Sequence, residues 1–351
     1  MSRHSLIRVA LEGLSFARAT RWLPDAPDAA GFAVTLHHVA PLTVSAFAPN
    51  ALLSVTPDFL DRFLGRFIAA GWRFVTVEEL VSDRGAEACG NRRIAVTLDD
   101  GFRDNFVHAL PVFRRHEVPF TLYVCPGFCD RTAELWWEAL ERIVARSPSV
   151  SLAAEGPAKE LPSRNPREKK IAFELWRQWL TTEADEARQR RAIRALAENY
   201  RLDLSALACE LVMDWDGIRA IAADPLCSIG AHTMTHPALG RLSSQAAFAE
   251  MRDSADRIEK EIGRRPATIA FPYGNPLAAG AREARLAEEA GFLASFTTRP
   301  GYVPLSGERH GLPRVSLNGL FQQIRYLEVL LTPGLWRLRD RIHAGRQRAE
   351  I

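Results

Sequence analysis

The chain has 351 residues, of which 47% are hydrophobic and 25% are charged, which is typical of a globular protein with a large buried core. The formal net charge of +3 is small for this length, and no basic stripe with interleaved aromatic residues occurs, so the sequence gives no indication of nucleic-acid binding. Five cysteines, few and odd in number, argue against a disulfide framework and favour a reducing compartment, so we expect a cytoplasmic location.

Residues 1–30 are expected to form an N-terminal extension. Glu12, Arg18 and Arg21 interrupt what would have to be the continuous apolar core of a signal peptide. No stretch reaches the roughly 20 apolar residues that a membrane-spanning helix needs. We therefore expect neither a signal peptide nor an integral membrane protein.

Buried strands and helices alternate from residue 31 onward. GFAVTLHHV (31–39) reads as a buried strand, and Thr56 is expected to cap a helix over residues 56–70 with Pro57 at its first position. RRIAVTLDDG and PFTLYVCPG have the character of strands buried on both faces, with a helix over 105–116 between them. These segments predict a βαβ unit.

The alternation continues to the end of the predicted barrel, residues 31–320. LCSIGAH precedes a helix over 243–262, and TIAFPYG and FLASFTT flank a helix over 281–290. This order predicts a parallel α/β barrel with its active site at the carboxyl ends of the strands. Helix-like segments between about 130 and 224 predict a helical insertion, whose Trp136, Trp137, Trp176 and Trp179 fit core packing better than a sugar-stacking platform.

TLDDGFRDN places Asp99 and Asp100 where a buried strand ends. Neighbouring strand residues point to opposite faces, so both carboxylates serve one site only if the backbone leaves regular geometry, which Gly101 permits. One carboxylate can then bind a metal while the other takes protons. The alternative is a strand-end pair that caps the next helix, a role that Asp104 also fits.

IGAHTMTHPAL places His232 and His236 four residues apart directly after another strand. In a helical turn this spacing puts both imidazoles on one side. Two histidines and one aspartate give three protein ligands and leave a coordination position open, as catalytic zinc sites require. The other aspartate is then the natural base.

Further candidates lie at other strand ends. Tyr273, in FPYGNP, belongs to a turn that can aim a backbone N–H into the site, although such turns are common. Of the adjacent His37 and His38, at most one should enter the site, because neighbouring strand residues diverge. His310 and Arg314, in HGLPRVSLN, are late candidates, for which a structural role is also open.

These motifs resemble the polysaccharide deacetylases of the NodB-homology class, carbohydrate esterase family 4. TLDDGFRDN resembles the first motif of the family, HTMTH the second and FPYG the third, and the resemblance covers residues 32 to 315. It implies a distorted (β/α) barrel of the NodB type. It further implies that Asp99 is the general base, that Asp100, His232 and His236 bind a divalent metal, most simply Zn²⁺, and that the Tyr273 N–H binds the oxyanion.

The sequence departs from the family at two points. Ala270 occupies the position where many members have an arginine that orients the base, and Arg314 is the candidate replacement. The late tryptophan and Leu-x-His motifs are not visible. A subgroup, similar to deacetylases of exported poly-N-acetylglucosamine, takes its acid from a Tyr-His-x-Val segment, with which LHHV aligns His37. We therefore expect His37, ahead of His38 or His310, to be the general acid.

The expected reaction is metal-dependent hydrolysis of the N-acetyl group of an amino sugar in a poly- or oligosaccharide, similar to that of chitooligosaccharide deacetylases. One alternative is a catalytically inactive carbohydrate-binding protein that has kept the fold. Another is a non-haem iron oxygenase, since two histidines and one carboxylate also form its facial triad. The second aspartate argues against both alternatives. The saccharide is the expected partner, and no protein partner is predicted.

Residues 321–351 form a basic amphipathic segment in which apolar residues recur among six arginines. They are Ile324, Leu327, Leu330, Leu331, Leu335 and Leu338, with Arg325, Arg337, Arg339, Arg341, Arg346 and Arg348. Such a segment either packs on the barrel, leaving a solvated arginine-rich tail, or lies peripherally on an anionic membrane.

Overall fold

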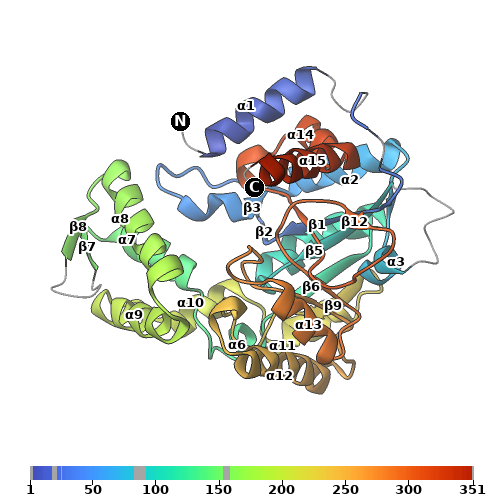
Figure 1. Cartoon of the computed structure of the whole chain (residues 1–351). Helices are drawn as coiled ribbons and strands as arrows, with labels where there is room; N and C mark the ends of the chain where they lie inside the picture. The colour runs from blue at the N-terminus through green and yellow to red at the C-terminus, as the bar shows by residue number, and fades with distance from the viewer. Residues whose placement is uncertain (1–2, 18–21, 25, 83–91, 153–158, 350–351) are drawn as a thin grey trace.

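The computed structural model of the chain describes residues 3–17, 22–24, 26–82, 92–152 and 159–349 (Figure 1). Within these residues, nine strands form one curled sheet. They are β1 (Ala29–Leu36), β4 (Arg73–Phe74), β5 (Arg93–Leu98), β6 (Phe120–Val124), β9 (Cys227–Ala231), β10 (Thr268–Ala270), β11 (Ala294–Phe296), β12 (Val303–Pro304) and β13 (Val315–Ser316).

The sheet has the order β11-β10-β9-β6-β5-β1-β12, with β4 beside β5 and β13 beside β1. All neighbouring strands are parallel except β1 and β12. The segment 312–316 joins the two sides of the sheet, because Leu312 bridges Phe296 of β11 and β13 pairs with β1. The curled sheet therefore closes through one short, irregular segment. The expected distorted (β/α) barrel with a helical insertion is confirmed.

Alternation along the strands separates an outer and an inner core. Val34, Val96 and Leu122 belong to a buried cluster on the outside of the sheet, which also contains apolar residues of the surrounding helices. Ala33 and Ala95 belong to a separate buried cluster together with Tyr123 and Phe296, residues that point to the inside. Small side chains from the first strands thus leave room inside the barrel for larger groups from other elements.

Helices cover the outside of the sheet (Figure 1). They are α2 (Pro57–Ala69), α3 (Val77–Val81), α5 (Leu110–His116), α12 (Ser244–Ile262) and α13 (Ala281–Glu289), and a π-helical turn, η4 (Asn105–Ala109), leads into α5. The predicted N-terminus of α2 is confirmed: the Thr56 side chain accepts the backbone N–H of Phe59, and Pro57 opens the helix. Phe59, Phe63 and Phe67, four residues apart, form its buried face.

Between β6 and β9 the chain forms helices and one hairpin, and the hairpin with the helices α7, α8 and α9 lies to the left of the barrel in Figure 1. The elements are α6 (Pro126–Cys129), α7 (Trp136–Arg146), β7 (Ser149–Leu152), β8 (Lys159–Pro162), α8 (Pro166–Gln178), the π-helical η5 (Trp179–Glu183), α9 (Glu186–Asn199), α10 (Leu204–Leu211) and α11 (Trp215–Ala222). The antiparallel β7–β8 hairpin was not expected from the sequence. Trp136, Trp137, Trp176 and Trp179 are all buried, so they belong to the core.

The chain termini add three helices, α1 (Arg3–Phe16), α14 (Ile324–Leu330) and α15 (Pro333–Ala349). Short elements near the carboxyl end of β1 complete the fold: β2 (His38–Val39), β3 (Ser54–Val55), η2 (Pro49–Leu53) and η7 (Gly319–Phe321). None of the described helices combines the length and apolar character needed to cross a bilayer. Four cysteines are free thiols, and Cys89 lies outside the described residues.

The inner core predicts a strong effect of substitution at Gly230, in the middle of β9. A Cβ atom there would lie 2.3 Å from the Tyr123 ring. We expect Gly230→Ala to lower the free energy of unfolding by about 1–3 kcal/mol through overpacking. Gly13→Ala is the matched control, because a Cβ at Gly13 meets nothing within 4 Å. Urea unfolding measures both, and an equal midpoint for the two variants would contradict the described packing.

Candidate metal and catalytic site

Asp99 points into the barrel because it continues the inward alternation of β5 after Ala95 and Thr97. The Arg314 guanidinium donates to both carboxylate oxygens, from Nη1 to Oδ1 at 2.7 Å and from Nη2 to Oδ2 at 2.8 Å. The Thr35 hydroxyl donates to Oδ2 at 3.2 Å. Burial alone would raise the pKa of Asp99, but the charge and hydrogen bonds of Arg314 hold it below its usual value. Asp99 is therefore an ionised, fixed carboxylate.

Asp100 turns away from the strand direction. Its φ is 74° and that of Gly101 is 77°, so the backbone leaves regular geometry at the aspartate itself and not only at the glycine. Its Oδ1 atom lies 3.5 Å from His232 Nε2 and 3.3 Å from His236 Nε2. Burial opposes ionisation, yet the nearby imidazoles, His236 first and then His232, hold the pKa of Asp100 well below its usual range.

His232 and His236 follow β9 in a loop, so the expectation that they share a helical turn is wrong. Thr233 and His236 have φ values of 59° and 60°, and these two left-handed residues bring the imidazole centroids to 5.1 Å. His232 Nδ1 lies 2.7 Å from the Ala270 carbonyl oxygen, to which it donates, leaving Nε2 directed at Asp100. Burial lowers the pKa of His232 to about 4, which keeps the imidazole neutral.

Thr235, between the two histidines, fastens the loop to two helices. Its backbone N–H and hydroxyl donate to the Glu250 carboxylate of α12 at 2.8 and 2.6 Å. Arg190 of α9 donates to its carbonyl oxygen at 2.6 Å and to its hydroxyl at 2.9 Å. The helical insertion therefore helps to hold the histidine loop, a contact between distant segments that sequence spacing does not reveal.

Aromatic rings confine the His236 imidazole. The ring centroids of Phe128, Trp137 and Tyr273 lie 5.3, 5.1 and 5.0 Å from it. The Trp136 indole N–H donates to the Tyr273 hydroxyl at 2.8 Å. The first two insertion tryptophans thus form a wall of the site.

Tyr273 occupies the turn after β10 with a φ of 60°. The Thr298 hydroxyl donates to its carbonyl oxygen at 2.6 Å, which fixes the peptide plane. Within the described residues, no acceptor contacts the Tyr273 backbone N–H. That N–H is therefore available to an oxyanion, although the pattern Pro-Tyr-Gly alone did not distinguish this turn from an ordinary one.

The adjacent histidines diverge as expected. His37 Nε2 lies 4.0 Å from Asp99 Oδ2, and its side chain is 22% exposed. Burial lowers the pKa of His37 despite the attraction of the nearby aspartates. His38 instead stacks on Phe102, with a centroid distance of 3.6 Å, and its Nδ1 lies 2.6 Å from Asp104 Oδ2. Of the two histidines, only His37 faces Asp99.

Two alternatives from the sequence do not hold in this geometry. Asp104 makes no capping hydrogen bond to the following helix, because its carboxylate accepts from His38 and from the Val39 N–H. His310 follows Arg309, whose carbonyl accepts the Ser295 N–H. The register of Leu312 with Phe296 places His310 beside the first residue of β11, the end opposite the site.

Glu138, in the first turn of α7, was missed by the sequence analysis. Its Oε1 atom lies 3.9 Å from His38 Nε2 and accepts from the Asn50 side chain at 3.3 Å. Burial raises the pKa of Glu138 to about 7. The burial of this glutamate could not be predicted from the helical segment itself, because its neighbours His38 and Asn50 are far away in the sequence.

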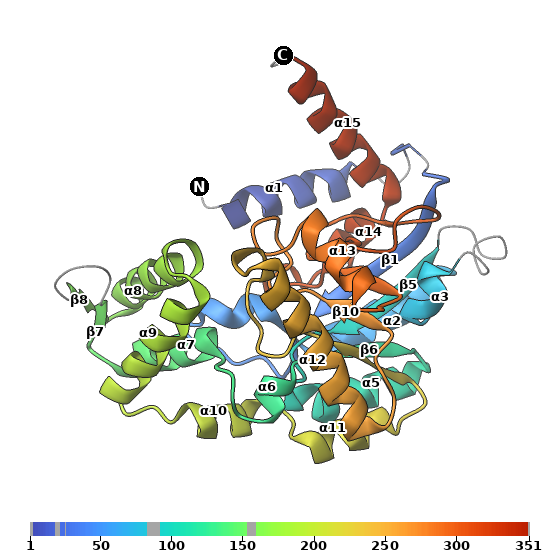
Figure 2. The ribbon, with the colours of Figure 1, turned by 60° about the horizontal axis from the view of Figure 1, so that its bottom comes forward.

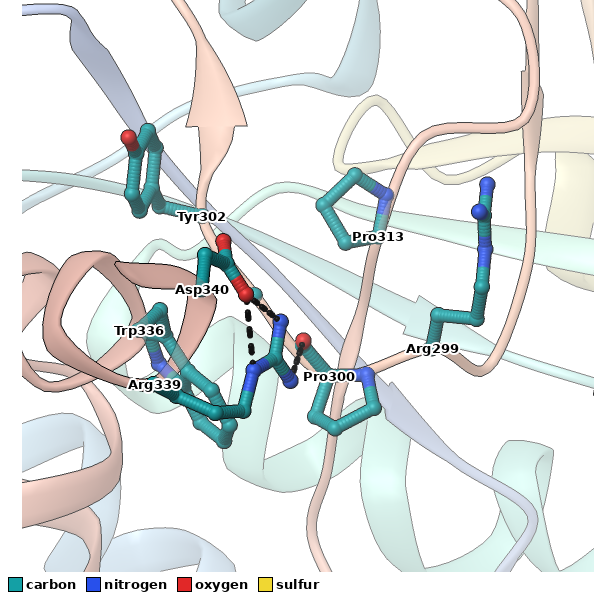
Figure 3. Close-up of a pocket in the computed structure, with 8 residues that line it drawn as sticks. Arg299, Pro300, Tyr302, Pro313, Trp336, Arg339 and Asp340 are labelled. Carbon is teal, nitrogen blue, oxygen red and sulfur yellow. Dashed lines mark hydrogen bonds and ion pairs between the residues drawn. The ribbon is translucent and has the colours of Figure 1, made fainter. Parts of the chain in front are cut away.

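A separate cavity of about 240 Å³ lies between the loop after β11 and α15 (Figure 3). Its lining residues include Arg299, Pro300, Tyr302, Trp336 and Arg339, and none of them belongs to the aspartate and histidine cluster. Arg339 donates to the Pro300 carbonyl at 2.8 Å and pairs with Asp340 at 2.7 Å. This cavity therefore marks where α15 is attached to the barrel.

Residues 179–293 match the family model described as polysaccharide deacetylase. This stretch contains His232, His236 and Tyr273, while the fold brings Asp99 and Asp100 to them. No curated protein matches the sequence. This match covers about a third of the chain, so it shows a similarity to polysaccharide deacetylases over residues 179–293, and the solved structures extend the likeness of the fold to most of the chain.

Solved structures share the fold at low sequence identity. The deacetylase PplD of Streptococcus pyogenes, in complex with acetate, has a TM-score of 0.55 and 16% identity, covering 86% of this chain and 98% of its own. The de-N-acetylase from Aggregatibacter actinomycetemcomitans has a TM-score of 0.55 and 12% identity, over 86% and 99%. IcaB from Ammonifex degensii has a TM-score of 0.51 and 16% identity, over 87% and 97%.

The raised pKa of Glu138 predicts a pH-dependent stability. A carboxyl whose pKa is raised on folding contributes stability that is present below the unfolded value and lost as pH rises through about 7. The free energy of unfolding of Glu138→Gln, relative to that of the wild type, should therefore increase by about 1–3 kcal/mol from pH 5 to pH 8. Urea unfolding at both pH values measures this. The control is Glu289→Gln, at the exposed end of α13, and an equal pH response of the two variants would refute the burial of Glu138.

Proposed function

We propose that the protein hydrolyses the N-acetyl group of an N-acetylated amino sugar in a poly- or oligosaccharide, using one divalent metal ion, and releases acetate. The observation that carries the proposal is the separation of two consecutive carboxylates: Asp99 pairs with Arg314, and Asp100 faces His232 and His236. One residue is thus suited to take protons and the other to bind a metal.

Asp100, His232 and His236 fit a divalent cation. Their potential ligand atoms lie within 4.8 Å of one another, and all three residues are buried. Asp100 Oδ1 is buried and has no hydrogen-bond partner. Burying a carboxylate oxygen in this way is unfavourable unless it binds a cation. Two imidazoles and one carboxylate are ligands that zinc accepts, with an open position for substrate or water. Zn²⁺ is therefore the ion that we propose.

A divalent ion at this site supplies an acidified water and polarises the acetamide carbonyl. Asp99 accepts the proton of the attacking water, because Arg314 keeps it ionised and oriented. The fixed Tyr273 N–H donates a hydrogen bond to the developing oxyanion.

His37 is the proposed general acid. The nitrogen of an amide leaves as an amine, which must be protonated as the C–N bond breaks because the amide anion is too basic to be expelled. His37 is partly exposed and faces Asp99, whereas His38 is bound by Asp104 and His310 lies at the other end of the barrel. Many family members have an arginine at the position of Ala270, and we propose that Arg314, from the segment that closes the sheet, replaces it.

Neither alternative function explains the same contacts. A carbohydrate-binding protein without activity could keep the Asp99–Arg314 pair for barrel closure, but it has no use for an ionised carboxylate directed into the site beside the Asp100 and histidine cluster. An oxygenase triad needs one carboxylate, and the parallel barrel differs from the β-sandwich expected for that class. The ionised Asp99 beside the Asp100 and histidine cluster therefore favours the hydrolase.

The first test measures acetate release from N-acetylglucosamine oligomers by zinc-loaded protein, together with bound zinc per chain. Asp99→Asn should retain zinc and lose activity by at least about a hundredfold, the usual contribution of a general base. Asp100→Asn should lose both zinc and activity, because it removes a ligand. Chelation of the wild type should have the effect of Asp100→Asn.

The general acid is tested with the variant His37→Gln, and His310→Gln is its matched control. Only the first should lower turnover, with bound zinc unchanged in both variants. Full activity of Asp99→Asn, or zinc binding that survives Asp100→Asn and His232→Gln, would contradict the assigned roles. Turnover absent from every saccharide tested, with zinc bound, would favour the binding protein.

A further inference from the structure

The two ends of the chain pack together on one side of the molecule (Figures 1 and 2). Leu11 of α1 is buried against Tyr326 and Val329 of α14. Glu12 pairs with Arg325 at 2.8 Å and accepts a hydrogen bond from the Tyr326 hydroxyl. Most apolar residues of the C-terminal segment are used in such packing, and Leu327 and Leu331 are 2% and 1% exposed. The segment is therefore not a free amphipathic helix by itself.

Helix α1 has a second apolar face that nothing covers within the described residues. Leu6, Val9 and Phe16 are 56%, 60% and 93% exposed. Together with Gly13 they recur at three- and four-residue spacing, so they form one stripe along the helix. Leu11 and Leu14 lie on the other, packed face. An amphipathic helix that only packed on the barrel would not need this outer stripe.

Helix α15 adds exposed apolar groups beside arginines. Trp336 and Arg339 face the loop at Pro300, as Figure 3 shows. Leu338 and Ile342, four residues apart, are neighbours on the helix surface. Their side chains are 38% and 51% exposed. In Figure 2, α15 extends away from the body of the protein close to α1.

Exposed apolar side chains are concentrated in these terminal segments. Seven of the seventeen large apolar side chains that are strongly exposed in the described residues belong to residues 6–22 or 338–342. They are Leu6, Ile7, Val9, Phe16, Trp22, Leu338 and Ile342. We call this group the terminal apolar surface.

Charge is distributed in the same way. Residues 1–24 contain four arginines and one glutamate, and residues 321–351 contain six arginines and three acidic residues, so each segment has a formal charge of +3. The whole chain is also +3, so residues 25–320 carry 3 minus 6, or −3. Both terminal segments are therefore cationic, whereas the sequence between them has a net negative charge.

We propose that the terminal apolar surface docks on an anionic lipid bilayer, with the apolar side chains in the headgroup and acyl boundary and the net positive charge of the two terminal segments attracted by the lipid phosphates. Trp22, 59% exposed, suits the same interface. Two copies of this surface would bring like charges together, which disfavours self-association as its purpose. Peripheral attachment is independent of the metal site, so the catalytically impaired Asp99→Asn variant binds lipid as the wild type does.

Co-sedimentation of the full chain with vesicles tests the proposal. Vesicles of phosphatidylcholine mixed with an equal amount of phosphatidylglycerol should bind the protein at least about tenfold more strongly than phosphatidylcholine alone, and added salt should weaken the binding. The triple variant Leu6→Ser, Val9→Ser, Phe16→Ser should lose that binding. Thermal unfolding of the variant checks that the chain still folds.

The matched control changes three exposed apolar residues elsewhere, Leu42→Ser, Val44→Ser and Leu277→Ser, which are 74%, 91% and 81% exposed. This variant should bind vesicles like the wild type. Equal loss of binding in both triple variants, equal binding to neutral and anionic vesicles, or no vesicle binding would overturn the proposal. So would a dimer in sedimentation equilibrium that the Leu6, Val9 and Phe16 substitutions dissociate.

Discussion

Arg314 enters the barrel from the segment that closes the curled sheet, and there it neutralises Asp99 with two short hydrogen bonds. Both side chains are almost completely buried, so neither is tolerable alone: removing one partner of a buried ion pair costs about 3–5 kcal/mol. Arg314 also donates to the Thr97 hydroxyl and the Thr297 carbonyl. The pair thus joins β5 to the end of β11, and barrel closure and the orientation of Asp99, the proposed base, depend on the same contact.

The part of the site that contains Asp100, His232, His236 and Tyr273 depends on strained backbone. Seven non-glycine residues of the described chain have positive φ, and four of them are Asp100, Thr233, His236 and Tyr273. Left-handed backbone at such residues costs on the order of 1–3 kcal/mol each and persists only where surrounding contacts impose it. In the histidine loop this restraint comes from Thr235, whose carbonyl accepts a hydrogen bond from Arg190 and whose backbone N–H donates to Glu250. Strained turns at three strand ends therefore aim these groups at one point.

Sequence reasoning predicted the proximity of the candidate site residues from local features. Strand-end position and residue type predicted that Asp99, Asp100, His232 and His236 would meet, because the carboxyl ends of parallel strands share one rim. It failed where the contact is made across the chain. The prediction that the histidines share a helical turn was wrong, because the sequence HTMTH does not indicate the left-handed backbone of Thr233 and His236. Glu138 was missed because its pKa is set by burial among residues far apart in sequence. The exposed apolar face of α1 likewise could not be predicted from the sequence, because it is defined only once the face that packs on α14 is known.

Anomalous diffraction from crystals grown with zinc tests the division of labour between the two aspartates most directly. The account predicts a single strong zinc peak bounded by the Asp100 carboxylate and by Nε2 of His232 and His236, with Asp99 still paired to Arg314. A zinc ion bound by Asp99, or zinc found only away from these three residues, would contradict it.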